Sequence, residues 1–561
     1  MKEKGSADSP FEEQELPFLL AGLKKVRLSP IFTHMVSFSM IGVISSLDFY
    51  CLCSTNCNLF VKKYDIFDEE GAAHMSEVVP DPVRSVYPLM GEYDEMYADD
   101  AAPRSHYEQV HRLFSRFRPE DLRARQKLVE RRMVEEGITF TLNSAVEGRE
   151  RERTIPFDVI PRIIPGEEWS VLEAGLVQRV RALNRFVHDI YHDQQIVRDG
   201  IIPRRMVMAN CYFRPEMARL QVPGQTYISV AGIDLIRHKD GNYYVLEDNL
   251  RCPSGFSYLF KSRSLMNQLF PELTFSSRIR DIERSLNGFL SALRSLSPSR
   301  SSEPVVALLT PGVHNSAYYE HVFLAQQMGL HLVEGQDLVA RNHRIYMRNM
   351  KGYQQVDVLY RRIDDDFLDP LSFRPDSMLG VAGIMNAYRA GNIALANAPG
   401  TGVADDKAMY IFVPQMIRYY LGEEPILRNV DTYLLSRPEE RDYVLDRLPE
   451  MVVKETSLSG GYGMLIGPEA TEEEIEAFRV KVMCRPDNYI AQPVMRLSRS
   501  PVLVDGKMSP RHIDLRAFVL TGTAGRPQVI PGGLTRVAMK EGTLVVNSSQ
   551  GGGVKDTWVL S

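Results

Sequence analysis

The most informative part of the sequence is YISVAGIDLIRHKDGNYYVLEDNLRCPSG, from Tyr227 to Gly255. At its centre, Asp240-Gly241 is a strong signal for a two-residue hairpin turn between β-rich flanks. Such a turn pairs Lys239 with Asn242, and every further pair of opposed residues follows from that register. The segment therefore predicts two antiparallel strands joined by a tight turn.

This register places Asp234 directly opposite Glu247. Because side chains alternate along a strand, Asn249 and Arg251 are expected on the face of Glu247. Opposed carboxylates have Cβ atoms about 5 Å apart and repel each other, so a cation, a proton or solvent must compensate them. Removing either carboxylate is expected to relieve this repulsion in the metal-free protein.

Two carboxylates and an amide oxygen form an all-oxygen ligand set that suits Mg²⁺. We therefore predict that Asp234, Glu247 and Asn249 bind magnesium. Arg251 adds a cationic fork for a phosphate and is assigned a catalytic role. The alternative is an ordinary hairpin face in contact with solvent. Apolar neighbours favour a hairpin built into a sheet, namely Ile233, Leu235, Val245 and Leu246.

Patterns elsewhere alternate between helix and strand. Helical periodicity covers about Tyr107 to Glu136, Val171 to Gln195 and Ser264 to Ser297. The Ser-rich run Pro298 to Ser302 is the best internal boundary. A buried strand at Val305 to Thr310, a helix and a further strand follow it, which predicts the start of an α/β layer.

Longer strings of sequence carry a resemblance to a known family. Asp234 followed by Glu247-x-Asn249 is similar to the magnesium signature of ATP-grasp ligases. Four more strings closely resemble the circularly permuted ATP-grasp group, type 2, which is related to the ligase half of glutathionylspermidine synthetase: NAPGTGVADDKA (397–408), SGGYGM (459–464), PGGLTRVA (531–538) and NSSQGGGVKDTW (547–558). The resemblance covers about Tyr87 to Ser561.

The resemblance implies an α+β ATP-grasp fold with circularly permuted domain order, because the hairpin with the metal signature precedes the candidate lid lysines. Four regions are expected. They are an N-terminal extension, disordered or accessory, at 1–80; a helical region with the metal-binding hairpin at 87–297; an α/β domain similar to a pre-ATP-grasp domain at 303–400; and the ATP-binding lid with the remaining core at 401–561.

Lys454 and the string after it resemble the phosphate lid of the family. Lys454 ends a strand-like run and is followed by Gly460, Gly461, Tyr462 and Gly463. Consecutive glycines let backbone N–H groups approach phosphate oxygens and let a lid move. An ordinary hairpin turn is the alternative. In the family, the lysine that matches Lys454 contacts an ATP phosphate, so all five residues are assigned to ATP binding.

Lys407 is expected in the first turn of a helix that Asp405 or Asp406 caps. A cation at this position opposes the helix dipole. Either an ion pair with Asp405 or a bound phosphate would compensate it, and the resemblance favours the phosphate.

The segment Tyr489–Val494 has the pattern of a short strand that ends at a proline. It is similar in position to the ATP-grasp hinge strand whose backbone binds adenine, so Gln492 is assigned to ATP binding. An ordinary edge strand is the alternative.

In HIDLRAFVL, alternation places His512, Asp514 and Arg516 on one face of a strand. Arg516 matches the phosphate-contacting arginine of the family and is assigned a catalytic role, whereas a solvated face is the alternative. Arg536 and Asn547 lie in strings that resemble the family, and no role is assigned to them.

The composition restricts the class of protein. The 66 Lys and Arg against 72 Asp and Glu give a net charge of −6, which argues against a nucleic-acid partner bound by bulk positive charge. Six cysteines are too few for a disulfide scaffold. Cys51, Cys53 and Cys57 crowd together without a second pair of ligands, so zinc is not favoured. Isolated thiols fit a reducing, cytoplasmic compartment.

The segment Met35–Cys53 is apolar and approaches the length of about 20 residues that spans a bilayer. Asp48 and several serines argue against a membrane anchor, and the position is wrong for a cleaved signal peptide. A buried or accessory helix and a poorly structured extension are the other interpretations, and a start at Met75 would remove the segment.

These patterns and the resemblance predict an ATP-dependent carboxylate–amine ligase of peptide type, which converts ATP to ADP through an acylphosphate. The expected cofactors are ATP and Mg²⁺, and the expected substrates are a small-molecule or peptide carboxylate and an amine. The alternatives are a catalytically silent nucleotide-binding or scaffold protein and a simple phosphotransferase.

Overall fold

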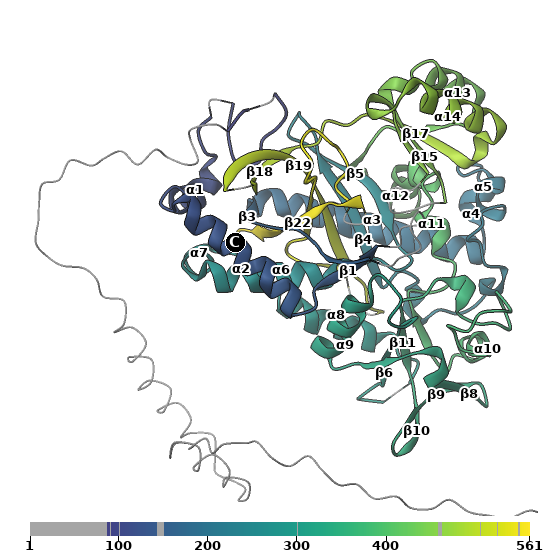
Figure 1. The fold of residues 1–561 in the computed structure, drawn as a ribbon. Coiled ribbons are helices and arrows are strands. Elements are labelled where there is room, and N and C mark those ends of the chain that lie inside the picture. The colour runs from purple at the N-terminus through teal and green to yellow at the C-terminus, as the bar shows by residue number, and fades with distance from the viewer. Residues whose placement is uncertain are drawn as a thin grey trace, which may run out of the picture. The chain divides into compact units, whose positions relative to one another are not determined.

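The structure is a computed structural model that describes residues 87–89, 91–99, 101–142, 151–299, 301–457, 463–504, 506–523, 526–547 and 550–561 (Figure 1). The predictions for Met35–Cys53 and for Gly460, Gly461 and Tyr462 lie outside these residues. Within the described ranges, no helix combines the length and the apolar character that crossing a bilayer requires.

A large, mostly antiparallel sheet forms the centre of the described chain. Its strand order is β13-β5-β4-β19-β21-β22-β3, and β18 and β20 each pair with β19. The strands are β3 (Phe157–Ile164), β4 (Val230–Arg237), β5 (Tyr243–Asn249), β13 (Arg428–Asn429), β18 (Arg499–Val504), β19 (Lys507–Leu520), β20 (Gln528–Val529), β21 (Leu534–Val537) and β22 (Gly553–Val559).

The β4–β5 hairpin confirms the pairing of Asp234 with Glu247, but its turn differs from the predicted one. The backbone N–H of His238 donates to the carbonyl of Asn242, so three residues form the loop, and Gly241 adopts a φ of 78° there. A β-bulge at Leu246 then adds one residue to β5 and restores the predicted register beyond it. The two deviations cancel at the carboxylate pair.

Strand β19 separates two hydrophobic cores, because its side chains alternate between the faces of the sheet. Leu515 and Val519 pack in the core that contains α3 (Gly166–Tyr191), while Phe518 and Leu520 pack in the core that contains α6 (Phe256–Leu269). Asp514 and Arg516 share the α6 face, further along the strand. The polar end of this face is therefore left for a ligand cavity rather than for a helix.

Helix α3 covers the opposite face with buried residues at helical spacing, and it packs against α12 (Val413–Leu421). The other two expected helical stretches are divided into shorter helices, and Pro119 and Pro271 each begin one of them. These helices are α1 (Glu108–Phe114), α2 (Pro119–Glu135), α7 (Pro271–Ser276) and α8 (Arg284–Ser295). The remaining short helices are α4 (Gln195–Arg198), α5 (Arg204–Met208), α10 (Ile384–Arg389) and α11 (Gly402–Asp405), and a small sheet pairs β1 (Thr139–Leu142) with β2 (Arg151–Thr154).

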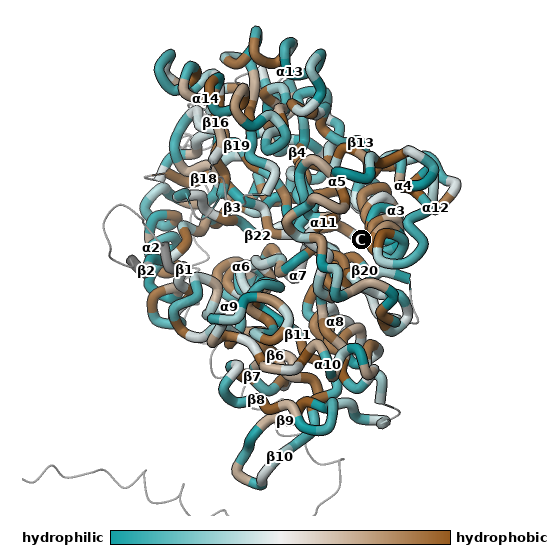
Figure 2. Tube along the Cα trace, turned by 90° about the vertical axis from the view of Figure 1, so that its right-hand side faces the viewer, coloured by the Kyte–Doolittle hydropathy of each residue, from teal (hydrophilic) through white to brown (hydrophobic). Residues whose placement is uncertain are grey.

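A parallel sheet confirms the predicted α/β layer. Its order is β12-β11-β6-β7, and α9 (Tyr318–Met328) connects β6 to β7. In Figure 2, apolar residues concentrate on β6 and β11, as expected for strands buried on both faces. The strands are β6 (Val306–Leu309), β7 (His331–Val333), β11 (Val358–Arg361) and β12 (Ala394–Ala396), and an antiparallel meander of β8 (Leu338–Arg341), β9 (Arg344–Asn349) and β10 (Gly352–Gln355) lies between β7 and β11 in sequence.

A separate four-stranded antiparallel sheet, here called the lid sheet, has the order β14-β17-β15-β16. Its strands are β14 (Tyr433–Leu434), β15 (Met451–Glu455), β16 (Met464–Ile466) and β17 (Tyr489–Pro493). Helices α13 (Pro438–Leu445) and α14 (Glu472–Cys484) cover one of its faces (Figure 1). Thr471 and Glu474 form a capping box that starts α14.

Candidate active site

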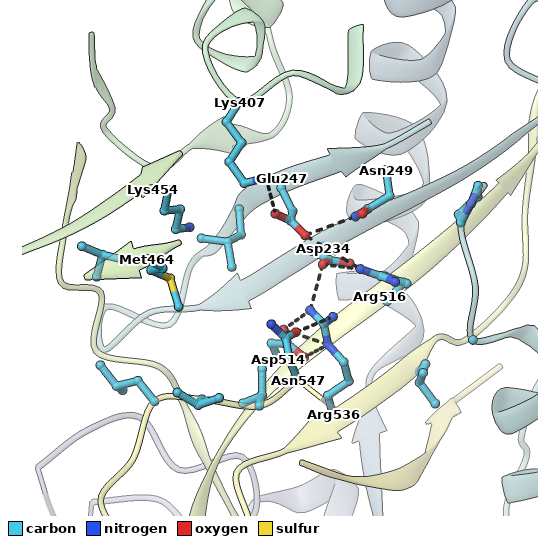
Figure 3. A pocket seen from close by; sticks show the side chains of 18 of the residues that line it. Asp234, Glu247, Asn249, Lys407, Lys454, Met464, Asp514, Arg516, Arg536 and Asn547 are labelled. Carbon is cyan, nitrogen blue, oxygen red and sulfur yellow. Dashed lines mark hydrogen bonds and ion pairs between the residues drawn. The ribbon is translucent and has the colours of Figure 1, made fainter. Parts of the chain in front are cut away.

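A cavity of about 500 Å³ is lined both by the large sheet and by the lid sheet. That volume lies within the range of small-molecule sites. The large sheet contributes Asp234, Glu247, Asn249, Asp514, Arg516 and Arg536, and the lid sheet contributes Val452, Lys454, Met464, Ile466 and Gln492. In Figure 3, Lys454 and Met464 lie on one side of the Asp234–Glu247 pair, and Asn249 and Arg516 lie on the other.

Asp234 is 1% exposed and is held by two arginines. Arg516 donates from Nε and Nη2 to its two oxygens at 2.6 and 2.7 Å, and Arg536 donates from Nη2 at 2.8 Å. Burial opposes ionisation, yet the two guanidinium groups outweigh it and hold the pKa of Asp234 below its usual range. The compensating cations in this structure are therefore arginines, and the interpretation as a solvated hairpin face is wrong.

Glu247 is engaged only loosely. Lys407 Nζ lies 3.8 Å from one of its oxygens, Arg516 Nη2 lies 3.9 Å from the other, and Asn249 Nδ2 donates to it at 3.5 Å. The predicted alternative, an ion pair between Lys407 and Asp405, is absent from the described ion pairs. The Asp405 carboxylate instead accepts from the backbone N–H groups of residues 250 and 251, at 2.6 and 3.1 Å.

Asp406, rather than Asp405, caps the turn after Lys407. Its Oδ1 accepts from the N–H of Ala408 at 2.8 Å, just before a 3₁₀ turn at Met409–Phe412. The cap fixes the backbone of Lys407 and leaves the lysine side chain directed at Glu247, as Figure 3 shows.

Lys454 and Gln492 interact across the lid sheet. Lys454 Nζ donates to Gln492 Oε1 at 2.7 Å, and Gln492 Nε2 donates to Thr432 Oγ1 at 3.0 Å. Burial lowers the pKa of Lys454 to about 8. Strand β17 pairs with β14 on one side and with β15 on the other, so the edge-strand alternative for this segment is wrong.

Gly463 is the one residue of the predicted glycine run that falls within the described ranges. Its φ of 65° lies in the left-handed region, which explains the glycine at this position. Met464 follows it, begins β16 and lines the cavity.

The face of β19 that carries Asp514 and Arg516 is buried, so the interpretation as a solvated face is wrong. Asp514 is 1% exposed and accepts from Arg536 Nε at 2.9 Å. The Leu497 carbonyl oxygen accepts a hydrogen bond from His512 Nδ1 at 3.1 Å, and His512 is not among the cavity-lining residues.

Arg251 lines the same cavity but has different neighbours from those predicted. Its guanidinium stacks on the ring of Tyr212 at 4.3 Å and lies 3.5 Å from both Asp364 and Asp405. Sequence reasoning did not single out Tyr212 or Asp364, because their segments have no recognisable pattern. Asp364 lines the cavity, and Tyr212 contacts Arg251. It also left Arg536 and Asn547 without a role. In the structure Arg536 Nη1 donates to Asn547 Oδ1 at 3.1 Å and completes the network around Asp234 (Figure 3).

The donor set around Glu247 fits magnesium. A carboxylate offers about four lone-pair positions, and Asp234 already uses three of them for arginine N–H groups. Glu247 and Asn249 have only long contacts, so their oxygens are the more available ligands. No group of three or more His, Cys, Asp or Glu residues that could hold a metal gathers in the described part of the chain, so the site depends on the amide of Asn249.

Residues 161–538 match the model of the family described as circularly permuted ATP-grasp type 2. An uncharacterized protein of Synechocystis sp. is 49% identical over 83% of this chain and 97% of its own length. An uncharacterized protein of Mycobacterium tuberculosis is 48% identical over 84% of each chain. A Frankia alni protein, provisionally named a glutamate–cysteine ligase, is 41% identical over 83% of this chain and 54% of its own length.

The fold has a counterpart among solved structures. A glutathione synthetase-like effector of Globodera pallida in its apo form superposes with a TM-score of 0.51 at 12% identity, over 79% of this chain and 98% of that chain. At this identity the likeness concerns the fold alone. With the family match, it confirms the predicted α+β fold with ATP-grasp domains in circularly permuted order.

Proposed function

Because the chain belongs to the circularly permuted ATP-grasp type 2 family, we propose that it is a ligase that joins a carboxylate to an amine and converts ATP to ADP. The observation that carries this proposal is the convergence of Lys407, Lys454 and Arg516 on one cavity around Glu247. Three cations beside one accessible carboxylate suit a triphosphate with its metal ion better than they suit a structural ion pair.

In this proposal the nucleotide lies between the lid sheet and the large sheet. Its base contacts the apolar lining of Val452, Met464 and Ile466, and its phosphates extend toward Lys407, Lys454 and Arg516. Glu247 and Asn249, with one oxygen of Asp234, would hold magnesium, which when bound neutralises part of the phosphate charge.

The proposed reaction has two steps. A carboxylate oxygen of the substrate attacks the γ-phosphorus, the bond to the β–γ bridging oxygen breaks, and ADP leaves. The amine nitrogen then attacks the acyl carbon, the bond between that carbon and the phosphate oxygen breaks, inorganic phosphate leaves, and the nitrogen loses a proton. Cationic side chains preorganised around the bridging oxygen stabilise the charge that develops there.

A covalent acyl-enzyme is not favoured. Cys252 lines the cavity, but its Sγ donates to the Ile363 carbonyl at 3.5 Å, and burial raises the pKa of its thiol. A protonated, buried thiol is a weak nucleophile. The substrate carboxylate is therefore the attacking group in the proposal.

Hydroxylamine trapping tests the reaction. The name of the Frankia alni relative makes L-glutamate the first acid to try. With ATP, Mg²⁺ and hydroxylamine, we expect a hydroxamate and ADP in equal amounts. AMP with pyrophosphate would refute the acylphosphate. ADP with a phosphoester would support a phosphotransferase, and binding of ATP without turnover of any acid would support a silent protein.

The affinity for ATP is expected to fall as the pH rises above about 8, because Lys454 then loses its proton. A bound phosphate favours the ammonium form, so the pKa of Lys454 is higher in the complex than in the free protein. The contribution of Lys454 to the affinity for ATP is fully present below the pKa that this lysine has in the free protein. Above that pKa the affinity falls, by at most about tenfold per pH unit.

Titration calorimetry at a series of pH values from neutral to alkaline measures this loss of affinity for ATP. Lys454→Arg is the matched variant, because arginine keeps its proton across this range. Its affinity should be nearly independent of pH. An equally flat profile for the wild-type protein would show that Lys454 does not contact the nucleotide.

A further inference from the structure

Arg251 is held in place but has few hydrogen-bond partners. The stacking on Tyr212 fixes its guanidinium plane, and its side chain is 17% exposed. Its hydrogen bond to Asp364 is 3.5 Å long, and its buried Nε lies 3.5 Å from Asp405 Oδ1 without forming a hydrogen bond. Charge-assisted hydrogen bonds are normally about 2.7–2.9 Å long, so this arginine has donors to spare on the cavity wall.

Asp364 is the least engaged of three consecutive carboxylates. Asp365 pairs with Arg361 at 2.6 Å and Asp366 pairs with Arg214 at 2.7 Å. Asp364, whose side chain is 53% exposed, makes only its long contact with Arg251 among the interactions described for it. It precedes a 3₁₀ turn at residues 365–367, but its carboxylate accepts no capping hydrogen bond from that turn. Its carboxylate is therefore available to a ligand cation.

The location also suits substrate recognition. Asp364 follows β11, and the connections after the adjacent strands β6 and β11 run to opposite sides of the parallel sheet. The crevice at such a point, beyond the carboxyl ends of the strands, is where open α/β sheets bind ligands. Arg251 follows Asn249, the last residue of β5. In Figure 3, Asn249 and Lys454 lie on opposite sides of the Asp234–Glu247 pair.

We propose that Arg251 and Asp364 form a subsite for the head group of an α-amino acid. Arg251 binds its α-carboxylate and Asp364 binds its α-ammonium, so that the side-chain carboxylate extends toward the phosphates. Asp405, the other carboxylate near Arg251, accepts two backbone N–H groups through Oδ2 and faces Arg251 through Oδ1, so Asp364 is the carboxylate left to bind the ammonium of a zwitterion. This inference rests on the proposed function, and it assigns Arg251 to the substrate rather than to a phosphate.

Three acids that differ by one charged group test the subsite. L-Glutamate carries both head-group charges, 4-aminobutyrate lacks the α-carboxylate, and glutarate lacks the α-ammonium. In the hydroxylamine assay with saturating ATP and Mg²⁺, we expect kcat/KM for L-glutamate to exceed that for either analogue at least about tenfold, as for one charge-assisted hydrogen bond.

The two variants are expected to lose different preferences. Arg251→Met should lose the preference over 4-aminobutyrate and keep the preference over glutarate, and Asp364→Asn should do the reverse. Arg251→Lys provides a second test at this position if the methionine variant melts early, because lysine keeps the charge but lacks the fork. It should lose most of the same preference.

Asp366→Asn is the matched control. Asp366 lies in the same loop, its side chain is 54% exposed, and it pairs with Arg214 outside this cavity. We expect wild-type ratios for all three acids. If Asp366→Asn changes the ratios as Asp364→Asn does, the effect belongs to the loop and the subsite is refuted.

The remaining outcomes separate this inference from the proposed function. Equal turnover of the three acids by the wild-type protein would overturn the subsite and leave the ligase activity standing. A loss of ATP affinity in Arg251→Met with unchanged ratios would assign Arg251 to a phosphate instead. Hydroxamate formed from other dicarboxylates or peptides, but from neither L-glutamate nor L-aspartate, would also overturn the subsite while supporting the ligase.

Discussion

Replacement of Glu247 by glutamine is expected to lower the rate of ADP formation by roughly 100- to 1,000-fold, which is typical of the loss of one preorganised electrostatic group. Glu247 is the available carboxylate of the proposed magnesium site, and its side chain is 27% exposed. Its nearest cations lie 3.8 and 3.9 Å away, so the free energy of unfolding should change by less than about 1 kcal/mol. A coupled assay for ADP and urea denaturation measure the two effects.

Glu423→Gln is a suitable control, because Glu423 also pairs with an arginine, Arg181 at 3.3 Å, but does not line the cavity. It should keep the wild-type rate. Full activity of Glu247→Gln would remove the metal site from the proposal, and a large loss of stability would show that Glu247 has a structural role.

Replacement of Asp234 by asparagine is expected to destabilise the protein by about 3–5 kcal/mol, the usual effect of removing one partner of a buried ion pair. The sequence alone favoured relief of repulsion between the carboxylates. The structure changes this expectation, because the amide would leave Arg516 and Arg536 without the negative charge that both guanidinium groups contact. ADP formation should also fall, since Arg516 would lose its orientation.

Urea denaturation without nucleotide or metal measures this effect directly. Asp376→Asn provides the comparison, because Asp376 contacts Arg374 at 2.7 Å in an exposed pair and should matter little for stability. Unchanged stability of Asp234→Asn would mean that the remaining carboxylates compensate the two arginines, Asp514 for Arg536 and Glu247 for Arg516.

The hairpin shows how far local sequence rules reach. Alternation and turn chemistry predicted that Asp234 opposes Glu247, and the structure has this pair. The same rules missed both the three-residue loop and the bulge at Leu246. A bulge depends on the neighbouring strands and cannot be recognised from the alternation of residue types along one strand. The pair was correct because the two errors have opposite signs.

The partners of Asp234 could not be predicted from such rules. Alternation placed Asp514 and Arg516 on one face, but nothing local indicates that β19 lies beside β4 or that Arg536 reaches across from β21. The long, family-like strings supplied the fold instead, and the family match bears that prediction out.

The pairing of β4 with β19 also has a consequence for folding during synthesis, because β4 is made long before its partner strand. Asp234 and Arg516 are 282 residues apart, so a ribosome that adds 5–20 residues per second needs roughly 15–55 s to pass from one to the other. If the β4–β5 hairpin forms before β19 is synthesised, the edge of β4 that later meets β19 has unpaired backbone groups during that interval. A pause in translation between the two strands would prolong the time during which this edge can join a second nascent chain, so the yield of folded protein should depend on elongation speed and on chaperones that cover the edge.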